Sequence, residues 1–332
     1  MTNPIRRSHA GILPGNRLSG CLVLHSWLIA STGNERCLIR RLATEPVPES
    51  LLTILFNLYK FHTQTNLKKR GSITLTILAP DFKDQHAVIT GGATGIGLAI
   101  AKRLAAEGAL VTLMGRRESL LQEAAKQIQD AIWCQVDIGV EASVTAGFEE
   151  ASRRHGPVTI LVNNAGAARS APFRKTDLTL WNEMVSVNMT GAYLCSRAVV
   201  QPMLEAGRGR IINVVSTAGL KGYAYTAAYT AAKHGAIGLT RAMAMEFATT
   251  GITVNAVCPG FADTEIVRES VKNIVQKTGK TEQESLAELV KHNPQKRLID
   301  PTEVADAVVW LANPSTTSIT GQAIIVAGGE LM

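Results

Sequence analysis

From Asp81 onward, short apolar runs typical of buried strands alternate with stretches in which apolar residues recur every three or four positions. This alternation predicts a parallel sheet covered by helices on both faces. About seven strands in roughly 250 residues favour one doubly wound, Rossmann-type α/β domain over residues 81–332. The expected strands are His86–Thr90, Leu110–Met114, Ala131–Val136, Thr159–Asn163, Arg210–Val215, Thr253–Val257 and Ala323–Val326, and the expected helices are Gly97–Glu107, Leu120–Gln129, Val144–Arg153, Trp181–Leu204 and Tyr229–Ala248.

Residues 1–80 form a basic N-terminal extension with a different texture. They hold ten Lys/Arg and three Asp/Glu, and this surplus equals the whole net charge of +7. The 24 basic and 24 acidic residues of the remainder balance. The main domain therefore has no charge excess that would favour a nucleic-acid partner.

The extension contains a short apolar run, Cys21–Ala30, preceded by Arg6, Arg7 and Arg17. A membrane span needs about 20 apolar residues, so we expect no membrane insertion here. Three interpretations stay open: a poorly ordered extension, a signal-peptide core, or an organelle transit sequence. The first includes an extension translated from an upstream start codon. We expect a cytoplasmic protein, with organelle targeting as the open alternative.

The cysteines are few and unpaired in sequence. None belongs to a CxxC pair, which argues against a zinc site or a disulfide framework and favours a reducing compartment. We therefore expect no metal. The five cysteines are Cys21, Cys37, Cys134, Cys195 and Cys258.

A glycine-rich turn follows the first strand of the main domain. The strand HAVIT leads into TGGATGIG at 90–97 and then into an apolar helix. Glycines let the backbone approach a pyrophosphate closely, and the helix N-terminus supplies free N–H groups with partial positive charge. The spacing GxxxGxG is one residue longer than GxGxxG. The turn predicts a dinucleotide site, against the alternative of a simple strand–helix connection.

Two arginines stand where the second strand ends, at Arg116 and Arg117. Dinucleotide sites place at this position either an acid for the ribose 2′-hydroxyl or a basic group for the 2′-phosphate. The planar fork of arginine suits a phosphate. We therefore expect NADP rather than NAD, with Arg116 as the first candidate. The alternative is a solvated pair of loop arginines.

Six motifs in order and register resemble the short-chain dehydrogenase/reductase family over about residues 83–330. They are TGGATGIG, NNAG at 163–166, VNMTG around Asn188, INVVSTAG around Ser216, Tyr229-x-x-x-Lys233 and PGFADT at 259–264. The resemblance implies hydride transfer between a nicotinamide and a ketone or secondary alcohol.

The catalytic group implied by the resemblance is Ser216, Tyr229, Lys233 and Asn188. Tyr229 and Lys233 lie four residues apart in a helical stretch and so share one face. A tyrosine titrates near pH 10, and a nearby ammonium is expected to lower that pKa toward the working range. Ser216 is expected to hydrogen-bond the substrate oxygen, Lys233 to contact the nicotinamide ribose, and Asn188 to hold a water for proton exchange. Tyr223 lacks a lysine partner at this spacing.

Further cofactor contacts are implied by the same resemblance. Asp137 is expected at the adenine, and the residues after the fourth strand beside the adenosine ribose. Thr264 is expected near the carboxamide or pyrophosphate. For Asp137 and Thr264 the alternative is helix capping. The full expected cofactor set, beside the two arginines, Tyr229 and Lys233, is Gly91, Thr94, Gly95, Ile96, Gly97, Asp137, Asn164, Ala165, Gly166, Pro259, Gly260 and Thr264.

Residues 264–300 match the family's substrate lid. Five basic residues in this stretch suit an acyl thioester of coenzyme A or a carrier protein, and the alternative is a solvated amphipathic face. The region Tyr229–Gly260 resembles 3-oxoacyl-carrier-protein reductases, polyketide ketoreductases and hydroxyacyl-CoA dehydrogenases. Whether the enzyme works physiologically as a reductase or as a dehydrogenase therefore stays open. The basic residues are Arg268, Lys272, Lys291, Lys296 and Arg297.

The resemblance also implies a homotetramer, built on the helix Tyr229–Ala248 and the last strand. That strand reads IIVAGGE, with Ala327 where the family often has Asp.

Two other functions compete with an NADP-dependent reductase: a secondary-alcohol or hydroxyacyl-CoA dehydrogenase that uses NAD, and a catalytically silent dinucleotide-binding protein. The presence of Ser216, Tyr229 and Lys233 favours an enzyme over the silent protein.

Overall fold

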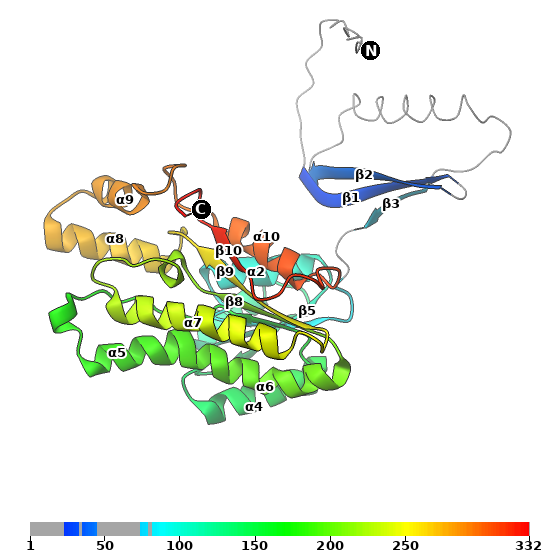
Figure 1. Cartoon of the computed structure of the whole chain (residues 1–332), viewed down its shortest axis with the longest axis horizontal. Coiled ribbons are helices and arrows are strands. Elements are labelled where there is room, and N and C mark those ends of the chain that lie inside the picture. The colour runs from blue at the N-terminus through cyan, green and yellow to red at the C-terminus, as the bar shows by residue number, and fades with distance from the viewer. Residues whose placement is uncertain (1–22, 33–34, 45–73, 79–81, 332) are drawn as a thin grey trace, which may run out of the picture. The chain divides into compact units, whose positions relative to one another are not determined.

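The structure, a computed structural model, describes residues 23–32, 35–44, 74–78 and 82–331. The chain divides into two compact units, residues 1–80 and residues 81–332 (Figure 1). The change of texture in the sequence falls at the same position.

Three strands are described in the first unit. They are β1 (Val23–Thr32), β2 (Glu35–Thr44) and β3 (Thr74–Leu78), and they form an antiparallel sheet in the order β2-β1-β3. Most of the apolar run Cys21–Ala30 is thus strand β1. Cys21 and the three preceding arginines lie outside the described residues. The role of this unit stays a prediction.

The second unit contains a seven-stranded sheet in the order β10-β9-β8-β7-β4-β5-β6. All neighbouring strands are parallel, which confirms the predicted doubly wound fold. The chain runs outward from β4 to β6, then returns to β7 beside β4 and runs outward the other way. Ligands bind at the carboxyl ends of the strands beside such a reversal. The strands are β4 (His86–Thr90), β5 (Leu110–Gly115), β6 (Ile132–Gln135), β7 (Ile160–Asn163), β8 (Gly209–Val214), β9 (Ile252–Pro259) and β10 (Ala323–Val326).

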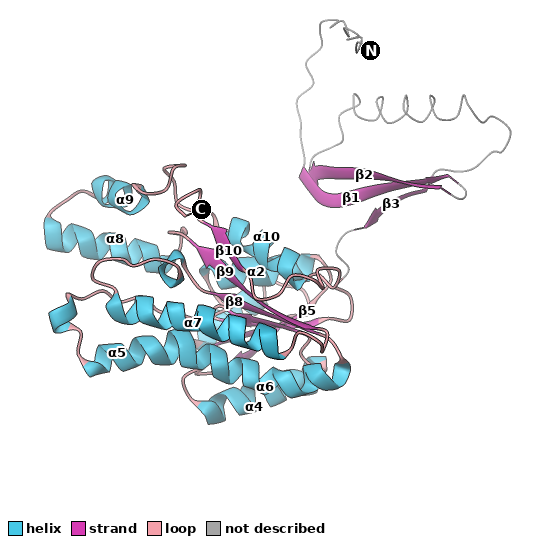
Figure 2. Ribbon diagram, viewed as in Figure 1, coloured by secondary structure: helices cyan, strands magenta, loops and turns pink. Residues whose placement is uncertain are grey.

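Helices cover both faces of this sheet (Figure 2). Side chains alternate along each strand, so Ile89 packs into the core with Leu104 of α2, while Val88 packs into the opposite core with Val199 of α6 and Met243 of α7. One core contains α2 (Gly95–Ala106), α3 (Glu118–Ala125) and α10 (Pro301–Ala312), and the other contains α4 (Glu141–His155), α6 (Gly191–Ala206) and α7 (Ala227–Glu246).

The single helix expected over Trp181–Leu204 is wrong. The structure has α5 (Leu178–Val185) and α6, joined by a π-helical segment, Ser186–Thr190. Apolar residues keep a helical spacing across the π-helical segment, which is why the sequence predicted a single helix. Asn188 lies inside the π segment, and such π-bulges recur at functional sites.

The expected lid forms two helices between β9 and α10. These are α8 (Glu265–Thr278) and α9 (Glu282–Val290), and α9 begins with a capping box between Thr281 and Glu284. Within the described part of the chain, no helix has both the length and the apolar character that crossing a membrane requires.

Candidate active site

The glycine-rich turn joins β4 to α2 in a conformation that needs glycine. Gly91 and Gly95 have φ values of +63° and +53°. A Cβ at Gly97 would lie 2.2 Å from the Gly91 carbonyl oxygen. The first hydrogen bond of the helix runs from the Leu98 N–H to Thr94, at 3.2 Å. The amides of residues 95–97 precede it, where a helix leaves N–H groups free for an anion.

Hydrogen bonds join the segment after β7 to this turn. The Thr90 hydroxyl oxygen accepts from the N–H groups of Asn164 and Ala165, both at 3.0 Å. The Asn164 side-chain amide donates to the carbonyls of Thr90 at 3.0 Å and Gly91 at 3.2 Å. Asn164 therefore fixes the shape of the turn, while its predicted contact with the cofactor stays a prediction.

Thr264 and the turn lie side by side, as a cofactor site needs. A Cβ built on Gly95 would meet the Thr264 methyl carbon at 3.1 Å. Thr264 occupies the N-cap position of α8, but its side chain makes no capping bond and its hydroxyl donates to Ala262 at 3.3 Å. Asp137 is not the N-cap of α4 either, because that residue is Val140. The capping alternative is thus wrong for both side chains.

The two candidate arginines differ in their surroundings. Arg117 is exposed and pairs with Glu265 at 3.5 Å. Arg116 is also exposed, and its carbonyl accepts from the Gln135 side chain at 2.9 Å. Among the described residues, no acidic side chain pairs with the Arg116 guanidinium. Arg116 is therefore the arginine with its charge available to a ligand.

Ser216, Tyr229 and Lys233 come together at the carboxyl end of β8. Ser216 follows β8, and its side-chain oxygen accepts from the Ala218 N–H at 3.1 Å. It lies near enough to the Tyr229 phenol to lower the pKa of that phenol. Tyr229 and Lys233 lie one turn apart on α7, with the Lys233 Nζ atom 5.8 Å from the centre of the Tyr229 ring. Lys233 is 5% exposed, and its ammonium donates to the Val214 carbonyl at 3.1 Å.

Burial dominates the electrostatics of this group. It raises the pKa of Tyr229, and the hydrogen bond with Ser216 offsets part of that rise. Burial lowers the pKa of Lys233 to about 8. The expectation that the ammonium lowers the pKa of Tyr229 is wrong for this structure, because burial raises that pKa. The Lys233 ammonium donates to the carbonyl of Val214 instead.

Asn188 holds the loop that follows β7. It is 4% exposed, and its side-chain amide donates to the carbonyls of Ala167 at 2.8 Å and Met184 at 3.0 Å. Its carbonyl oxygen accepts from the Ala167 N–H at 3.3 Å. A Cβ on Gly166 would lie 2.8 Å from that oxygen and 3.7 Å from Lys233 Nζ. Asn188 and Lys233 therefore flank the same glycine, and the water proposed between them stays a prediction.

The sequence analysis did not predict a buried polar network that lies between the strands and helices carrying the catalytic residues. The Asn213 side-chain oxygen accepts from Asn163 at 2.9 Å, and its amide donates to Thr240 of α7 at 2.8 Å. Asn163 also donates to Ser196 of α6 at 3.1 Å. An asparagine inside an otherwise apolar strand was the available signal. The network ties β7 and β8 to the helices that carry the site.

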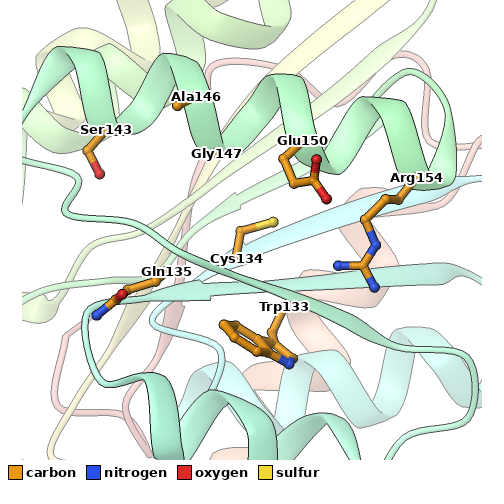
Figure 3. A pocket seen from close by; sticks show the side chains of 8 residues that line it. All are labelled: Trp133, Cys134, Gln135, Ser143, Ala146, Gly147, Glu150 and Arg154. Carbon is orange, nitrogen blue, oxygen red and sulfur yellow. The ribbon is translucent and has the colours of Figure 1, made fainter.

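A hollow of about 400 Å³ lies elsewhere, between the edge strand β6 and α4 (Figure 3). Trp133, Cys134, Glu150 and Arg154 are among its lining residues. Burial raises the pKa of the Cys134 thiol, which keeps it protonated. The hollow contains none of the predicted catalytic residues.

Comparison with known proteins agrees with this geometry. The pattern of the short chain dehydrogenase family matches residues 85–274. The chain belongs to this family. It is therefore an NAD(P)-dependent oxidoreductase that acts on CH–OH and C=O groups.

Relatives include several reductases and dehydrogenases. A Streptomyces coelicolor protein named as a ketoacyl reductase is 39% identical over 256 residues, which cover 73% of this chain and 95% of the relative. An acetoacetyl-CoA reductase from Rhizobium meliloti is 36% identical, covering 74% of this chain and 97% of the relative. A crystal structure of an actinorhodin polyketide ketoreductase variant with NADPH has a TM-score of 0.72 and 35% identity, covering 74% of this chain and 97% of that one.

Proposed function

We propose that the enzyme is an NADP-dependent reductase of 3-oxoacyl thioesters, carried on coenzyme A or on a carrier protein. The observation that carries the proposal is the grouping of Ser216, Tyr229 and Lys233 at the carboxyl edge of the sheet, the edge at which the glycine-rich turn also lies. The names of the relatives, an acetoacetyl-CoA reductase and polyketide ketoreductases among them, favour this substrate class.

In reduction, Tyr229 gives its proton to the substrate oxygen, and Ser216 donates a hydrogen bond to the same oxygen. Lys233 has a pKa of about 8, so near neutrality it can return a proton toward the phenol. Asn188 shapes the loop beside Lys233 and would hold the water through which that proton is replaced. The bound nicotinamide supplies the hydride.

NADP is the proposed cofactor because the Arg116 guanidinium has no acidic partner among the described residues. The free N–H groups at the start of α2 suit the pyrophosphate, and the collision that a Cβ at Gly97 would make shows how little side-chain room the turn has. Asp137, Gly166, Pro259 and Gly260 would complete the cofactor site.

The basic character of the lid does not strengthen the thioester assignment. Arg268 pairs with Asp263, Lys291 with Glu288, and Arg297 with Glu303. Much of the lid's positive charge is therefore already neutralised, as the alternative of a solvated face expects. The thioester proposal rests on the relatives and on the catalytic group.

We propose a homotetramer as the assembly. Large apolar side chains are exposed along the outer helices, at Leu178 and Trp181 of α5, Tyr193 of α6 and Met245 of α7. Exposed apolar surface of this kind is typical of an interface. Size-exclusion chromatography with light scattering tests this, and a monomer would refute it.

The test of function is NADPH and NADH oxidation with acetoacetyl-CoA, its carrier-protein thioester and a ketone panel. Tyr229→Phe should lower kcat at least about a hundredfold, since it removes the proton donor. Tyr225→Phe, at a tyrosine that is 66% exposed, is the matched control. Preference for NADH would overturn the cofactor assignment, and turnover of simple ketones alone would overturn the thioester.

A further inference from the structure

The segment after β10 buries a glutamate among polar partners. The Glu330 side chain is 3% exposed. Its Oε1 accepts from the Tyr223 hydroxyl at 2.6 Å and pairs with the Lys221 ammonium at 2.8 Å. A carboxylate this buried is costly without such partners. Both partners belong to the loop that joins Ser216 to α7.

The contacts continue from Glu330 toward Ser216. The Tyr223 hydroxyl uses its single proton on Glu330, so at the 2.7 Å contact between Tyr223 and Thr217 the threonine hydroxyl is the donor. Thr217 is 3% exposed and directly follows Ser216. A chain of two hydrogen bonds therefore links the carboxylate to the residue beside Ser216.

The same cluster touches the segment after β9. The Tyr223 ring meets the Phe261 ring edge-to-face, with centres 6.3 Å apart. A Cβ built on Gly260 would lie 3.3 Å from Glu330 Oε2. Glu330 and Tyr223 thus join the segments that follow β8, β9 and β10 at the carboxyl end of the sheet.

Tyr223 cannot replace Tyr229 as the proton carrier. Its single hydroxyl proton is held in the hydrogen bond to the Glu330 carboxylate, and burial together with that carboxylate raises the pKa of Tyr223. The phenol stays protonated and acts as a fixed donor to the carboxylate.

We propose that Glu330 is a positioning residue: by holding Tyr223, and through it Thr217, it fixes the Ser216 hydroxyl in the direction of the substrate oxygen. The inference rests on the proposed function, in which Ser216 hydrogen-bonds that oxygen. Losing Glu330 removes no atom of the proton donor or of the proposed cofactor contacts but lets the loop that carries Ser216 move.

The variants Glu330→Ala, Glu330→Gln and Tyr223→Phe test this, with Glu123→Gln as control at an exposed carboxylate that pairs with Lys126. Glu330→Ala should lower kcat about tenfold, the size expected for one charge-assisted hydrogen bond, with KM for the cofactor changed less than about twofold. Glu330→Gln should recover part of the loss, because its amide oxygen still accepts from Tyr223. Tyr223→Phe should resemble Glu330→Ala, and the double variant should be no worse.

The path through Ser216 has its own test. In a Ser216→Ala background, Glu330→Ala should not lower the residual rate further. An equal loss in both backgrounds, or a kcat at the wild-type level in both Glu330→Ala and Tyr223→Phe, would overturn the proposal.

Hydrogen exchange supplies a readout that needs no turnover. Amides of residues 216–223 should exchange faster in Glu330→Ala than in wild type, while those of β4 and β7 stay unchanged. Unchanged exchange in residues 216–223 would overturn the proposal. If no thioester is reduced but exchange still responds, the proposed substrate fails and the role of Glu330 in holding the loop survives.

Discussion

We predict that acid destabilises the fold because His86, at the start of β4, is buried in its neutral form. The side chain is 1% exposed, and its two ring nitrogens contact the Gly156 carbonyl at 2.7 Å and the Thr112 hydroxyl at 2.8 Å. A carbonyl only accepts, so Nδ1 carries the proton and Nε2 accepts from Thr112. Both positions are satisfied by a neutral ring, and burial lowers the pKa of His86 from 6.5 to about 4.

The size of the stability loss follows from the linkage between proton binding at His86 and unfolding. Between pH 6.5 and pH 4 the unfolded chain binds a proton at His86 that the folded chain does not, so the free energy of unfolding falls as the pH falls. At about 1.4 kcal/mol per pKa unit, the loss is about 2.5 kcal/mol by pH 4.5. His155, whose ring centre lies 5.3 Å away, has its pKa lowered by burial and adds a loss of the same sign.

The assay is urea unfolding at fixed protein concentration between pH 7.5 and 4.5. His86→Asn keeps a donor for Gly156 and removes the titration, so it should be less stable than wild type at pH 7.5 but lose about 2.5 kcal/mol less on acidification. His292→Asn, at an exposed histidine, is the control and should follow wild type. Parallel curves for His86→Asn and wild type would refute the reasoning.

Three further outcomes are expected. Arg116→Ala should raise KM for NADPH by about 10- to 100-fold with little change for NADH, while Arg117→Ala changes it less, as steady-state kinetics with both cofactors would show. Gly97→Ala should abolish cofactor binding measured by calorimetry, because its Cβ would lie 2.2 Å from the Gly91 oxygen, and binding at wild-type affinity would contradict this. Asn213→Ala should cost about 1–3 kcal/mol of unfolding free energy in urea, since Asn163 and Thr240 lose a buried partner; an unchanged midpoint would argue against the network.

The sequence was sufficient for features that depend on local pattern. The strand–helix alternation predicted the parallel sheet, and the spacing of Tyr229 and Lys233 placed them on one helix face. Features that depend on contacts between distant segments were not readable. Glu330 reaches Tyr223 across 107 positions, and no local period signals that approach.

The electrostatics were the other part that sequence could not supply. The expected drop in the pKa of Tyr229 considered only the nearby ammonium. Desolvation depends on how deeply α7 packs against the sheet, which only the fold determines. The break near Asn188 was hidden because apolar residues still recur every three or four positions across the π segment, as at Val185, Met189 and Ala192.

That π segment has a consequence for how the enzyme tolerates changes in length. A π turn closes over one more residue than an α turn, and each residue of a helix rotates the chain by about 100°. Deleting a single residue from Ser186–Thr190 could therefore restore an uninterrupted helix while swinging Asn188 away from Ala167. Such a deletion would remove the hydrogen bonds between Asn188 and Ala167 and so release the loop beside Lys233. Among relatives, a one-residue gap at this position would signal lost activity more clearly than most substitutions.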